Sequence, residues 1–310
     1  MRDLTIPLQA CHFEIIFSAQ ATQSQMKLST SSNLSFVGRL RYIQAIHEPP
    51  ERRGPDRLVR HFFPVPERWR CRFLSRDELD KLRSLPFYYY LLARTKYYDA
   101  VFSEAINGNV TYIVNVGCGT DTRAHRFGLA LERQGITVLE CDLPEVISAK
   151  RRIGRRLGPA GHVQYLSLDL NDEAWLELMH WLDKISGAKV MVMMEGVSPF
   201  IGEETFSRFL MLLGTKLARG SMVAYDFKLE GVANDFGRAG LTGNTFRLPD
   251  SREQILAYHK QSGFRLTHME LSWELEARLL PDLAEARIPF FRQDGLVQIQ
   301  VEERPECRLL

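Results

Sequence analysis

Four residues recur along this chain at nearly even spacing, each just past a short apolar run that predicts a β-strand. They are Gly117 after TYIVNV, Asp142 after ITVLEC, Asp169 after VQYLSL and Glu195 after KVMVMM, and they lie 25, 27 and 26 residues apart. Glycine lets the backbone approach a ligand closely, and carboxylates accept hydrogen bonds from ribose hydroxyls or an adenine amino group. A glycine turn followed by acids on the next strands is therefore what a nucleoside-bearing cofactor needs.

The same spacing predicts the elements that would bring these residues together. One period corresponds to a strand, a crossover helix and two loops. Because such crossovers are right-handed, consecutive strands run parallel, and all four residues reach the carboxyl edge of one sheet. Open α/β sheets bind their ligands at that edge.

Further elements complete the expected architecture, a doubly wound α/β sheet of seven strands. The other strands are SMVAYDF (221–227), FRLTHMEL (264–271) and GLVQIQVEE (295–303), and the helices lie near 121–134, 143–157, 172–185, 203–218 and 250–262. A Gly-rich loop is expected over 231–245, and segment 272–294 is too long for a tight hairpin.

The part of the chain before the first strand predicts helices. Apolar residues at mixed three- and four-residue spacing indicate an amphipathic helix within 27–48, and Pro86 begins a strong helix that ends at Asn107-Gly108. We therefore divide the chain into a loose N-terminal extension (1–25), a helical lid or substrate-binding region (26–108) and a cofactor-binding core (109–310).

The composition argues against several classes of protein. Hydrophobic residues make up 45% of the 310 positions, which suits a packed core, and the net charge of +2 comes without a long basic run. The clusters ERRGPDR and KRRIGRR are interpreted as solvated faces, so we expect no nucleic-acid partner. No apolar stretch reaches the roughly 18 residues of a membrane span. The oligomeric state is left open.

The cysteines and the N-terminus indicate a reduced, cytoplasmic protein. Five scattered cysteines show no metal-ligand spacing, so we expect no metal, and Cys118 inside the glycine turn is interpreted as a small residue that fits there. Ala-Gln-Ala at 19–21 mimics a signal cleavage site, but His12 and Glu14 interrupt the apolar stretch before it. We therefore expect no signal peptide, and Met26 is an alternative to Met1 as the natural start.

The third of the four recurring residues, Asp169, separates two cofactors. The turn Asn115-Val-Gly-Cys-Gly-Thr-Asp121 would also serve NAD, but NAD sites favour GxGxxG, and Thr122 stands at the third glycine position. Asp169-Leu170 supplies an acid for the adenine amino group and a backbone N–H for a ring nitrogen, which favours S-adenosylmethionine (SAM). Asp142 has a second interpretation as the N-cap of a helix that begins at Leu143-Pro144.

Taken in order, these segments resemble the leucine carboxyl methyltransferase family. VNVGCGTDTRAHRF (114–127) resembles the family signature, which runs close to LGAGxDTRxxRL, and ARTKYYDAVF (93–102) resembles its upstream helix. ECDLPEVISAK (140–150), SLDLND (167–172) and MEGVSPFIGEE (194–204) match later blocks. The resemblance covers about 90–227 well and 27–63 loosely. It implies a class I SAM-dependent methyltransferase, with a methyltransferase core over 109–310 and an N-terminal helical lid.

The resemblance also implies a role for each matching residue. Arg94 would bind the SAM carboxylate, Gly117 would lie against the methionine portion, Asp142 would hold the ribose, Asp169 and the Leu170 backbone would hold the adenine, and Glu195 would sit near the amino end of the methionine.

Some of these positions keep a second interpretation. Arg94 would otherwise form a salt bridge on a helix surface, and Glu195 would be a solvated acid at a strand end. Asp121 and Arg123 would either brace the turn as an internal ion pair or contact the ligand. His125 departs from the bulky aromatic residue expected there and is interpreted as structural. Arg60-His61-Phe62 departs from the Asp-Pro of bacterial relatives.

The function implied is an O-methyltransferase that acts on a hydroxyl or carboxyl oxygen of a small molecule, a polyketide or peptide natural product. Family members with GCGxDTR include such enzymes, and the aromatic residues of segment 87–98 would either line an apolar pocket or belong to the core. A hydroxyl needs a base, for which Asp226, at the expected tip of the fifth strand, is the candidate. The alternatives are a protein carboxyl methyltransferase acting on a C-terminal leucine and an inactive SAM-binding module.

Overall fold

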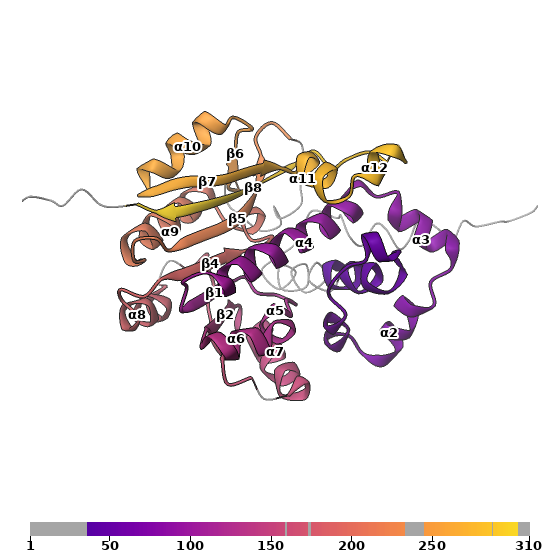
Figure 1. Cartoon of the computed structure of the whole chain (residues 1–310), viewed down its shortest axis with the longest axis horizontal. Coiled ribbons are helices and arrows are strands. Elements are labelled where there is room, and N and C mark those ends of the chain that lie inside the picture. The colour runs from indigo at the N-terminus through magenta and orange to yellow at the C-terminus, as the bar shows by residue number, and fades with distance from the viewer. Residues whose placement is uncertain (1–35, 159, 173–174, 233–244, 287, 303–310) are drawn as a thin grey trace, which may run out of the picture.

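One mixed sheet organises the molecule (Figure 1). The computed structural model describes residues 36–158, 160–172, 175–232, 245–286 and 288–302. The strands are β1 (Tyr112–Val116), β2 (Thr137–Asp142), β3 (Val163–Ser167), β4 (Val190–Met194), β5 (Met222–Leu229), β6 (Arg247–Leu248), β7 (Phe264–Leu271) and β8 (Asp294–Val301). Their order is β3-β2-β1-β4-β5-β8-β7, and β6 pairs with β5.

The first five strands run parallel, as the sequence predicts. The chain moves outward from β1 to β3 and then crosses back to β4 on the other side of β1. This reversal between β1 and β4 is the topological switch point, the place where open α/β sheets form a ligand crevice. The loops after β1, β2, β3 and β4 therefore share one edge, and they carry the four residues with which the sequence prediction began.

Alternate residues of the strands face two hydrophobic clusters, one on each side of the sheet. Ile113 and Val138 belong to the cluster that includes α4 (Pro86–Asn107), whereas Val114 and Leu139 belong to the cluster that includes α8, α9 and α10. The other helices after β1 are α5 (Arg123–Arg126), α6 (Gly128–Gln134), α7 (Pro144–Leu157), α8 (Leu176–Lys184), η4 (Ser198–Phe200), α9 (Glu203–Lys216), α10 (Arg252–Gln261), α11 (Ser272–Leu279) and α12 (Asp282–Glu285). The sheet is thus covered on both faces, as doubly wound folds are.

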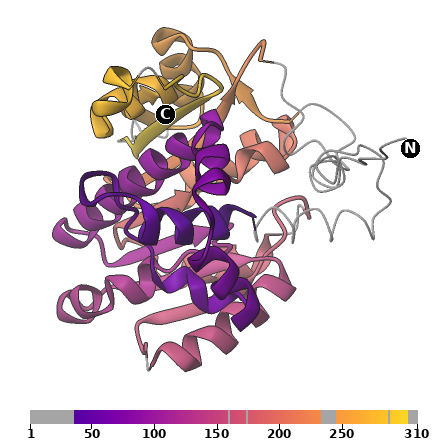
Figure 2. The ribbon, with the colours of Figure 1, turned by 90° about the vertical axis from the view of Figure 1, so that its right-hand side faces the viewer.

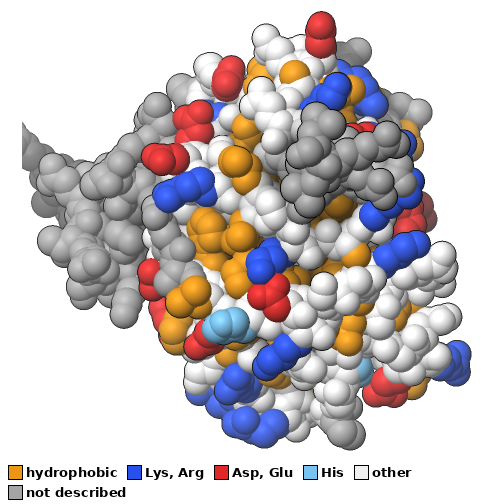
Figure 3. Space-filling model, turned by 90° about the vertical axis from the view of Figure 1, so that its left-hand side faces the viewer, with side chains coloured by type: hydrophobic (Ala, Val, Ile, Leu, Met, Phe, Trp, Pro, Cys, Tyr) orange, Lys and Arg blue, Asp and Glu red, His pale blue; other side chains and the backbone are white. Residues whose placement is uncertain are grey.

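The segment before β1 is helical and lies toward the carboxyl ends of the parallel strands (Figures 1 and 2). It contains a helix through residues 36–47, η2 (Pro50–Arg52), η3 (Leu58–Phe62), α2 (Val65–Arg72), α3 (Arg76–Arg83) and α4. We call residues 36–83 the lid segment. The face of the molecule opposite to that of Figure 2 shows hydrophobic side chains near its middle, interspersed with charged ones (Figure 3).

Several predictions need correction. β5 continues to Leu229, so Asp226 lies inside the strand and not at its tip. The helix expected over 121–134 is divided into α5 and α6, which meet at Phe127. The two-residue strand β6 was not predicted, and most of the expected loop over 231–245 lies outside the described residues, as does the extension 1–25. The boundary between lid and core stays a prediction.

Candidate functional site

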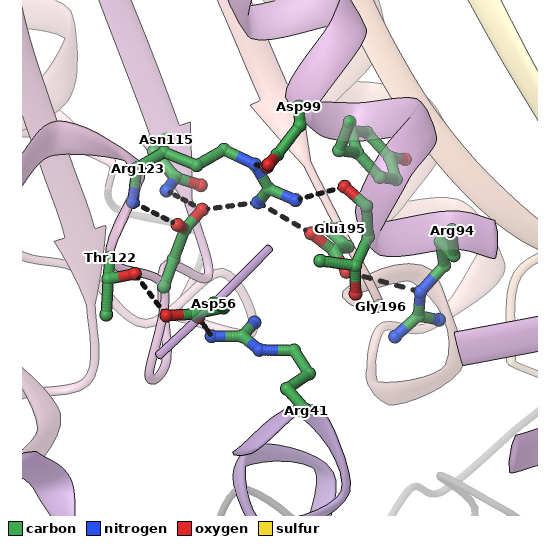
Figure 4. Close-up of polar contacts among 12 residues, drawn as sticks. Arg41, Asp56, Arg94, Asp99, Asn115, Thr122, Arg123, Glu195 and Gly196 are labelled. Atoms are coloured by element: carbon green, nitrogen blue, oxygen red, sulfur yellow. Dashed lines mark hydrogen bonds and ion pairs between the residues drawn. The ribbon is translucent and has the colours of Figure 1, made fainter. Parts of the chain in front are cut away.

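Charged side chains, four of them buried and two partly buried, gather at the carboxyl edge of β1, β4 and β5, beside α4 (Figure 4). We call this group the edge cluster; its members are Arg94, Asp99, Asp121, Arg123, Glu195 and Asp226. Two of the residues predicted for the cofactor, Arg94 and Glu195, belong to it. Burial of charges is costly unless each is paired and hydrogen-bonded, so their contacts indicate what the cluster is built to do.

Arg94 lies at one end of the edge cluster and pairs with two of its carboxylates (Figure 4). Its side chain is 8% exposed, and Nη1 donates a hydrogen bond to Oδ2 of Asp226 over 3.2 Å. Nε lies 3.4 Å from Oε1 of Glu195 but makes no hydrogen bond within the described part of the chain. Burial lowers the pKa of Arg94, but Asp226 and Glu195 raise it more, so the guanidinium stays charged. The surface salt-bridge interpretation is therefore wrong, and one donor of this arginine is left over.

A glycine keeps space beside this arginine. Gly196 follows β4 with a φ of +69°, a left-handed conformation that favours glycine. A Cβ atom there would lie 3.3 Å from Nη2 of Arg94. The backbone N–H of Gly196 donates to Oδ1 of Asp226 over 2.7 Å, which fixes the loop next to the guanidinium.

Asp226 anchors this arrangement from within the sheet. Oδ1 accepts hydrogen bonds from the Gly196 N–H and from the Tyr98 hydroxyl, at 2.7 and 3.0 Å, while Oδ2 accepts from Arg94. The side chain is 1% exposed. Burial raises the pKa of Asp226, and the Arg94 guanidinium counteracts part of that rise. Both oxygens of Asp226 thus accept hydrogen bonds, and the carboxylate is fixed where it holds Arg94.

Arg123 joins the glycine turn to the end of β4. Nη1 donates to Asp121 Oδ2 over 2.7 Å and to Glu195 Oε2 over 2.8 Å, and Nε donates to Asp99 Oδ1 over 2.8 Å. Burial lowers the pKa of Arg123, but these three carboxylates raise it well above its ordinary value. Asp121 and Arg123 therefore form the internal ion pair, and Glu195, whose side chain is 9% exposed, is held by Arg123 and is not a solvated acid.

The turn after β1 closes onto the end of β2. The backbone N–H of Gly119 donates to Oδ2 of Asp142, and the N–H of Leu143 donates to Oδ1, both over 2.7 Å. Burial raises the pKa of Asp142, while these two N–H groups oppose the rise. The N-cap of α7 is Leu143, without a side-chain cap, so the N-cap interpretation of Asp142 is wrong. An ionised carboxylate has about four lone-pair positions, which leaves acceptor capacity for a ligand.

Gly117 is required by packing as well as by its conformation. Its φ is +67°, and a Cβ atom would lie 2.4 Å from Cγ2 of Val197. The loop after β4 thus packs directly on the glycine turn. This contact brings the turn and Glu195 to the same place.

The residues after β3 lie farther along the edge. Asp169 is exposed, and its Oδ1 accepts the backbone N–H of Asn171 over 2.9 Å. Leu170 is buried, and its carbonyl accepts the indole N–H of Trp175 over 3.1 Å. Because the N–H of Leu168 bonds to the carbonyl of Asp142, over 2.8 Å, this loop runs next to the end of β2.

The structure also adds residues that the sequence analysis did not assign. Tyr98 and Asp99 reach the edge cluster from α4, and the four-residue step from Arg94 to Tyr98, which places both on one helical face, was the signal available for Tyr98. Arg41 and Asp56 of the lid segment bond to the glycine turn. Nothing in their local sequence indicates this, since the partners lie far away in the chain.

Three further observations concern the described residues. No group of three or more His, Cys, Asp or Glu side chains in the part that the structure describes is arranged to hold a metal ion. None of the helices within the described ranges is long and apolar enough to cross a membrane. Most aromatic residues of segment 87–98 are buried in the core, while Phe87 is half-buried.

Several known proteins that this chain resembles are described as methyltransferases. The profile of a family described as leucine carboxyl methyltransferase matches residues 41–213. A relative from Mycolicibacterium smegmatis is 28% identical over 199 residues, which cover 64% of this chain and 61% of the relative. Another from Mycobacteroides abscessus is 28% identical over 218 residues, covering 68% and 66%. Both carry the provisional name of S-adenosyl-L-methionine-dependent methyltransferase, and the chain spans about three fifths of the first one's length.

A solved structure shows the fold. A protein from Thermobifida fusca, described provisionally as a methyltransferase, superposes with a TM-score of 0.54 at 12% identity, over 87% of this chain and 98% of that one. The class I methyltransferase fold expected from the sequence is thereby confirmed.

Proposed function

The chain belongs to the leucine carboxyl methyltransferase family, and we propose that it transfers the methyl group of SAM to an oxygen atom of a small-molecule acceptor. The observation that carries the proposal is the buried, charge-paired guanidinium of Arg94, whose Nε donor makes no hydrogen bond within the described residues. Such a donor in a buried, charge-paired site needs a partner, and the carboxylate of SAM is a suitable one.

The edge cluster fits the methionine part of SAM. Arg94 would bind the carboxylate, and Glu195, which Arg123 holds through Oε2, would present Oε1 toward the amino group. Gly117 and Gly196 keep Cβ atoms away from this region. The matching of one cationic and one anionic side chain to an amino acid's two charges supports this orientation.

The neighbouring loops fit the adenosine part. Asp142 would accept hydrogen bonds from the ribose hydroxyls with the lone pairs that Gly119 and Leu143 leave. Asp169 would accept from the adenine amino group, and the Leu170 backbone would donate to a ring nitrogen. Asp169 is exposed, which supports a contact at the outer end of the cofactor.

When bound, SAM supplies an activated methyl group on a positively charged sulfur. The positive charge disappears as the new bond forms, so an unpaired carboxylate beside it would stabilise the ground state and slow the transfer. In the edge cluster, Asp226 pairs with Arg94, and Asp121 and Glu195 pair with Arg123. The protein's contribution would then be to align the acceptor oxygen with the methyl group in a site without water.

We assign Asp226 a positioning role and not that of a general base. Its oxygens are taken by Arg94, Tyr98 and the Gly196 N–H, and the strand places it inside the sheet. A carboxylate acceptor would need no base, because it is already ionised at neutral pH. A hydroxyl acceptor would need a base, and the pH profile described below tests whether the rate depends on one.

The binding test compares Arg94→Lys with the parent by calorimetry against SAM and S-adenosylhomocysteine. A lysine offers a point charge and cannot donate to Asp226 and a ligand through a planar fork, so we expect the dissociation constant to rise at least tenfold. Arg278→Lys is the matched control, because the exposed Arg278 also pairs with a carboxylate, that of Glu270 at 2.6 Å, outside the edge cluster. Equal affinity of the Arg94 variant and the parent would remove Arg94 from the site.

The acceptor test follows label from methyl-labelled SAM. A rate that is flat from about pH 6 to 9 favours a carboxylate acceptor, whereas a rate that rises with pH favours a hydroxyl. The product distinguishes them independently, since a methyl ester releases methanol in alkali and a methyl ether does not. A protein with a C-terminal leucine is the alternative acceptor, suggested by the family's description, and label in protein instead of small molecules would support it.

A further inference from the structure

Arg41 reaches from the lid segment into the glycine turn. It lies on the helix through residues 36–47 and is 6% exposed. Its Nη2 lies 2.7 Å from the carbonyl oxygen of Thr120. The same atom lies 2.7 Å from Oδ2 of Asp56 (Figure 4). A charged donor on a main-chain carbonyl fixes the orientation of that peptide group, because rotation of the peptide would break the bond.

Asp56 holds the other side of the same turn. Its side chain is 1% exposed, and Oδ1 accepts the hydroxyl of Thr122 over 2.6 Å and the backbone N–H of Val59 over 3.0 Å. The lid therefore grips the turn at two positions, on either side of Asp121. Neither grip uses a residue that the proposed function places against the cofactor.

Backbone packing reinforces these bonds. A Cβ atom on Gly38, one turn before Arg41 on the same helix, would lie 3.1 Å from Oγ1 of Thr120 and 2.9 Å from Cζ of Phe63. The helix thus rests on the turn with no room for a side chain at this position. The contact between lid and turn thus combines close packing of the Gly38 backbone on Thr120 with hydrogen bonds made by charged side chains.

Hydrogen bonds of the turn connect the contact with Arg41 to the side of the turn that faces the cofactor. The peptide between Thr120 and Asp121 has its carbonyl held by Arg41 and its N–H bonded to the Cys118 carbonyl over 2.8 Å. The next residue toward the strand, Gly119, donates its N–H to Asp142. Movement of the Thr120 peptide would therefore shift the Gly119 N–H away from the carboxylate.

We infer that Arg41 and Asp56 are positioning residues for cofactor binding, and that docking of the lid segment and binding of SAM stabilise each other. The inference rests on the proposed function, in which the glycine turn and Asp142 hold the cofactor. Linkage makes the effect reciprocal: if a docked lid raises affinity for the cofactor, the cofactor raises the stability of the docked lid by the same factor.

The first test measures affinity for S-adenosylhomocysteine by calorimetry, at a temperature well below the melting point of every variant. Arg41→Gln removes the grip on Thr120, and we expect the dissociation constant to rise at least tenfold. The control is Arg83→Gln, which breaks another ionic pair of the lid, Arg83 with the buried Glu48 at 2.8 Å, away from the turn. We expect the control to change affinity by less than about threefold. If Arg41→Gln acted only by lowering the stability of the fold, its affinity for the ligand would not fall tenfold at a temperature well below the melting point.

The second test needs no variant to fold. Hydrogen exchange of the parent chain, with and without S-adenosylhomocysteine, should show slower exchange in residues 36–63 when the ligand is bound. Two outcomes would overturn this inference but not the proposed function. In the first, the parent protein binds the ligand without this protection. In the second, Arg41→Gln binds the ligand as well as the parent does. A parent chain that binds neither SAM nor S-adenosylhomocysteine overturns the proposed function and this inference with it.

Discussion

Gly119 and Asp142 share a 2.7 Å hydrogen bond from backbone N–H to Oδ2, which ties the turn after β1 to the end of β2. The carboxylate proposed to hold the ribose thus also closes the loop that approaches the cofactor. One side chain is therefore expected to contribute both to the shape of the site and to the contact with the ligand. The two contributions separate when folding and binding are measured on the same variant.

Asp142→Ala should weaken SAM binding about a hundredfold, since loss of two charge-assisted contacts costs roughly 3 kcal/mol. It should also lower the free energy of unfolding by about 1–3 kcal/mol, because the N–H groups of Gly119 and Leu143 lose their acceptor. Calorimetry and denaturant titration measure the two effects. Glu145→Ala, exposed on the first turn of α7, is the control. Affinity within about threefold of the parent would refute the ribose assignment.

Asp226→Asn distinguishes positioning from base catalysis. If Asp226 positions Arg94, the variant should bind SAM at least tenfold more weakly, because the guanidinium loses one of its two charged partners. If Asp226 were the base, methyl transfer would slow at least tenfold while affinity stayed nearly intact. Calorimetry and single-turnover transfer from labelled SAM give both quantities. Glu48→Gln, at a buried acid of the lid that pairs with Arg83, should leave affinity unchanged. Unchanged affinity of the Asp226 variant would contradict the positioning role.

Gly117→Ala should destabilise the protein by several kcal/mol. Its φ of +67° is unfavourable for alanine by about 1–2 kcal/mol, and the new Cβ would lie 2.4 Å from Cγ2 of Val197. Adding Val197→Ala removes the clashing methyl group but not the backbone strain. We therefore expect the double variant to lose less free energy of unfolding than the two single variants lose together, as measured by a double-mutant cycle in denaturant. Strict additivity would show that the two residues do not clash.

Glu276 should make stability depend on pH. Burial raises its pKa to about 8, although the Phe291 N–H donates to it, over 2.7 Å. The folded state then holds a proton that the unfolded state, with an ordinary glutamate, releases. The stability that Glu276 contributes is thus complete near pH 4.5 and is lost as the pH rises to about 8.

The measurement is the free energy of unfolding from pH 5 to 8.5. We expect Glu276→Gln to lose about 1–3 kcal/mol less over this interval than the parent, since an amide does not titrate. Glu104→Gln, at an exposed position of α4, should behave like the parent. Identical pH profiles of the Glu276 variant and the parent would show that Glu276 is already ionised when folded.

The sequence predicted the parallel core well because each strand, helix and loop there is complete within one short period. The position of Asp226 was wrong for a different reason: β5 continues beyond the apolar run, through Lys228, which pairs with Asp294 of β8 across the sheet. A partner that far along the chain leaves no local signal. The two residues of β6 are likewise too few to show a pattern.

The sequence predicted the site residues that directly follow a core strand. It did not predict those that come from the distant lid segment. Asp142 and Glu195 follow recognisable strands, so their shared edge follows from the topology. Arg41, by contrast, bonds to Thr120 across 79 positions, and Asp56 bonds to Thr122 across 66. Such contacts depend on how the lid segment packs, which periodicity and motifs do not specify.

The order of the sheet has a consequence for synthesis of the chain. β8 lies between β5 and β7 and pairs antiparallel with both, although it is made after them. Until residues 294–301 leave the ribosome, the edge of β5 from Met222 to Lys228 has no strand beside it. Unpaired strand edges recruit other chains, so the growing polypeptide passes through a stage prone to aggregation, just before the last strand closes the sheet.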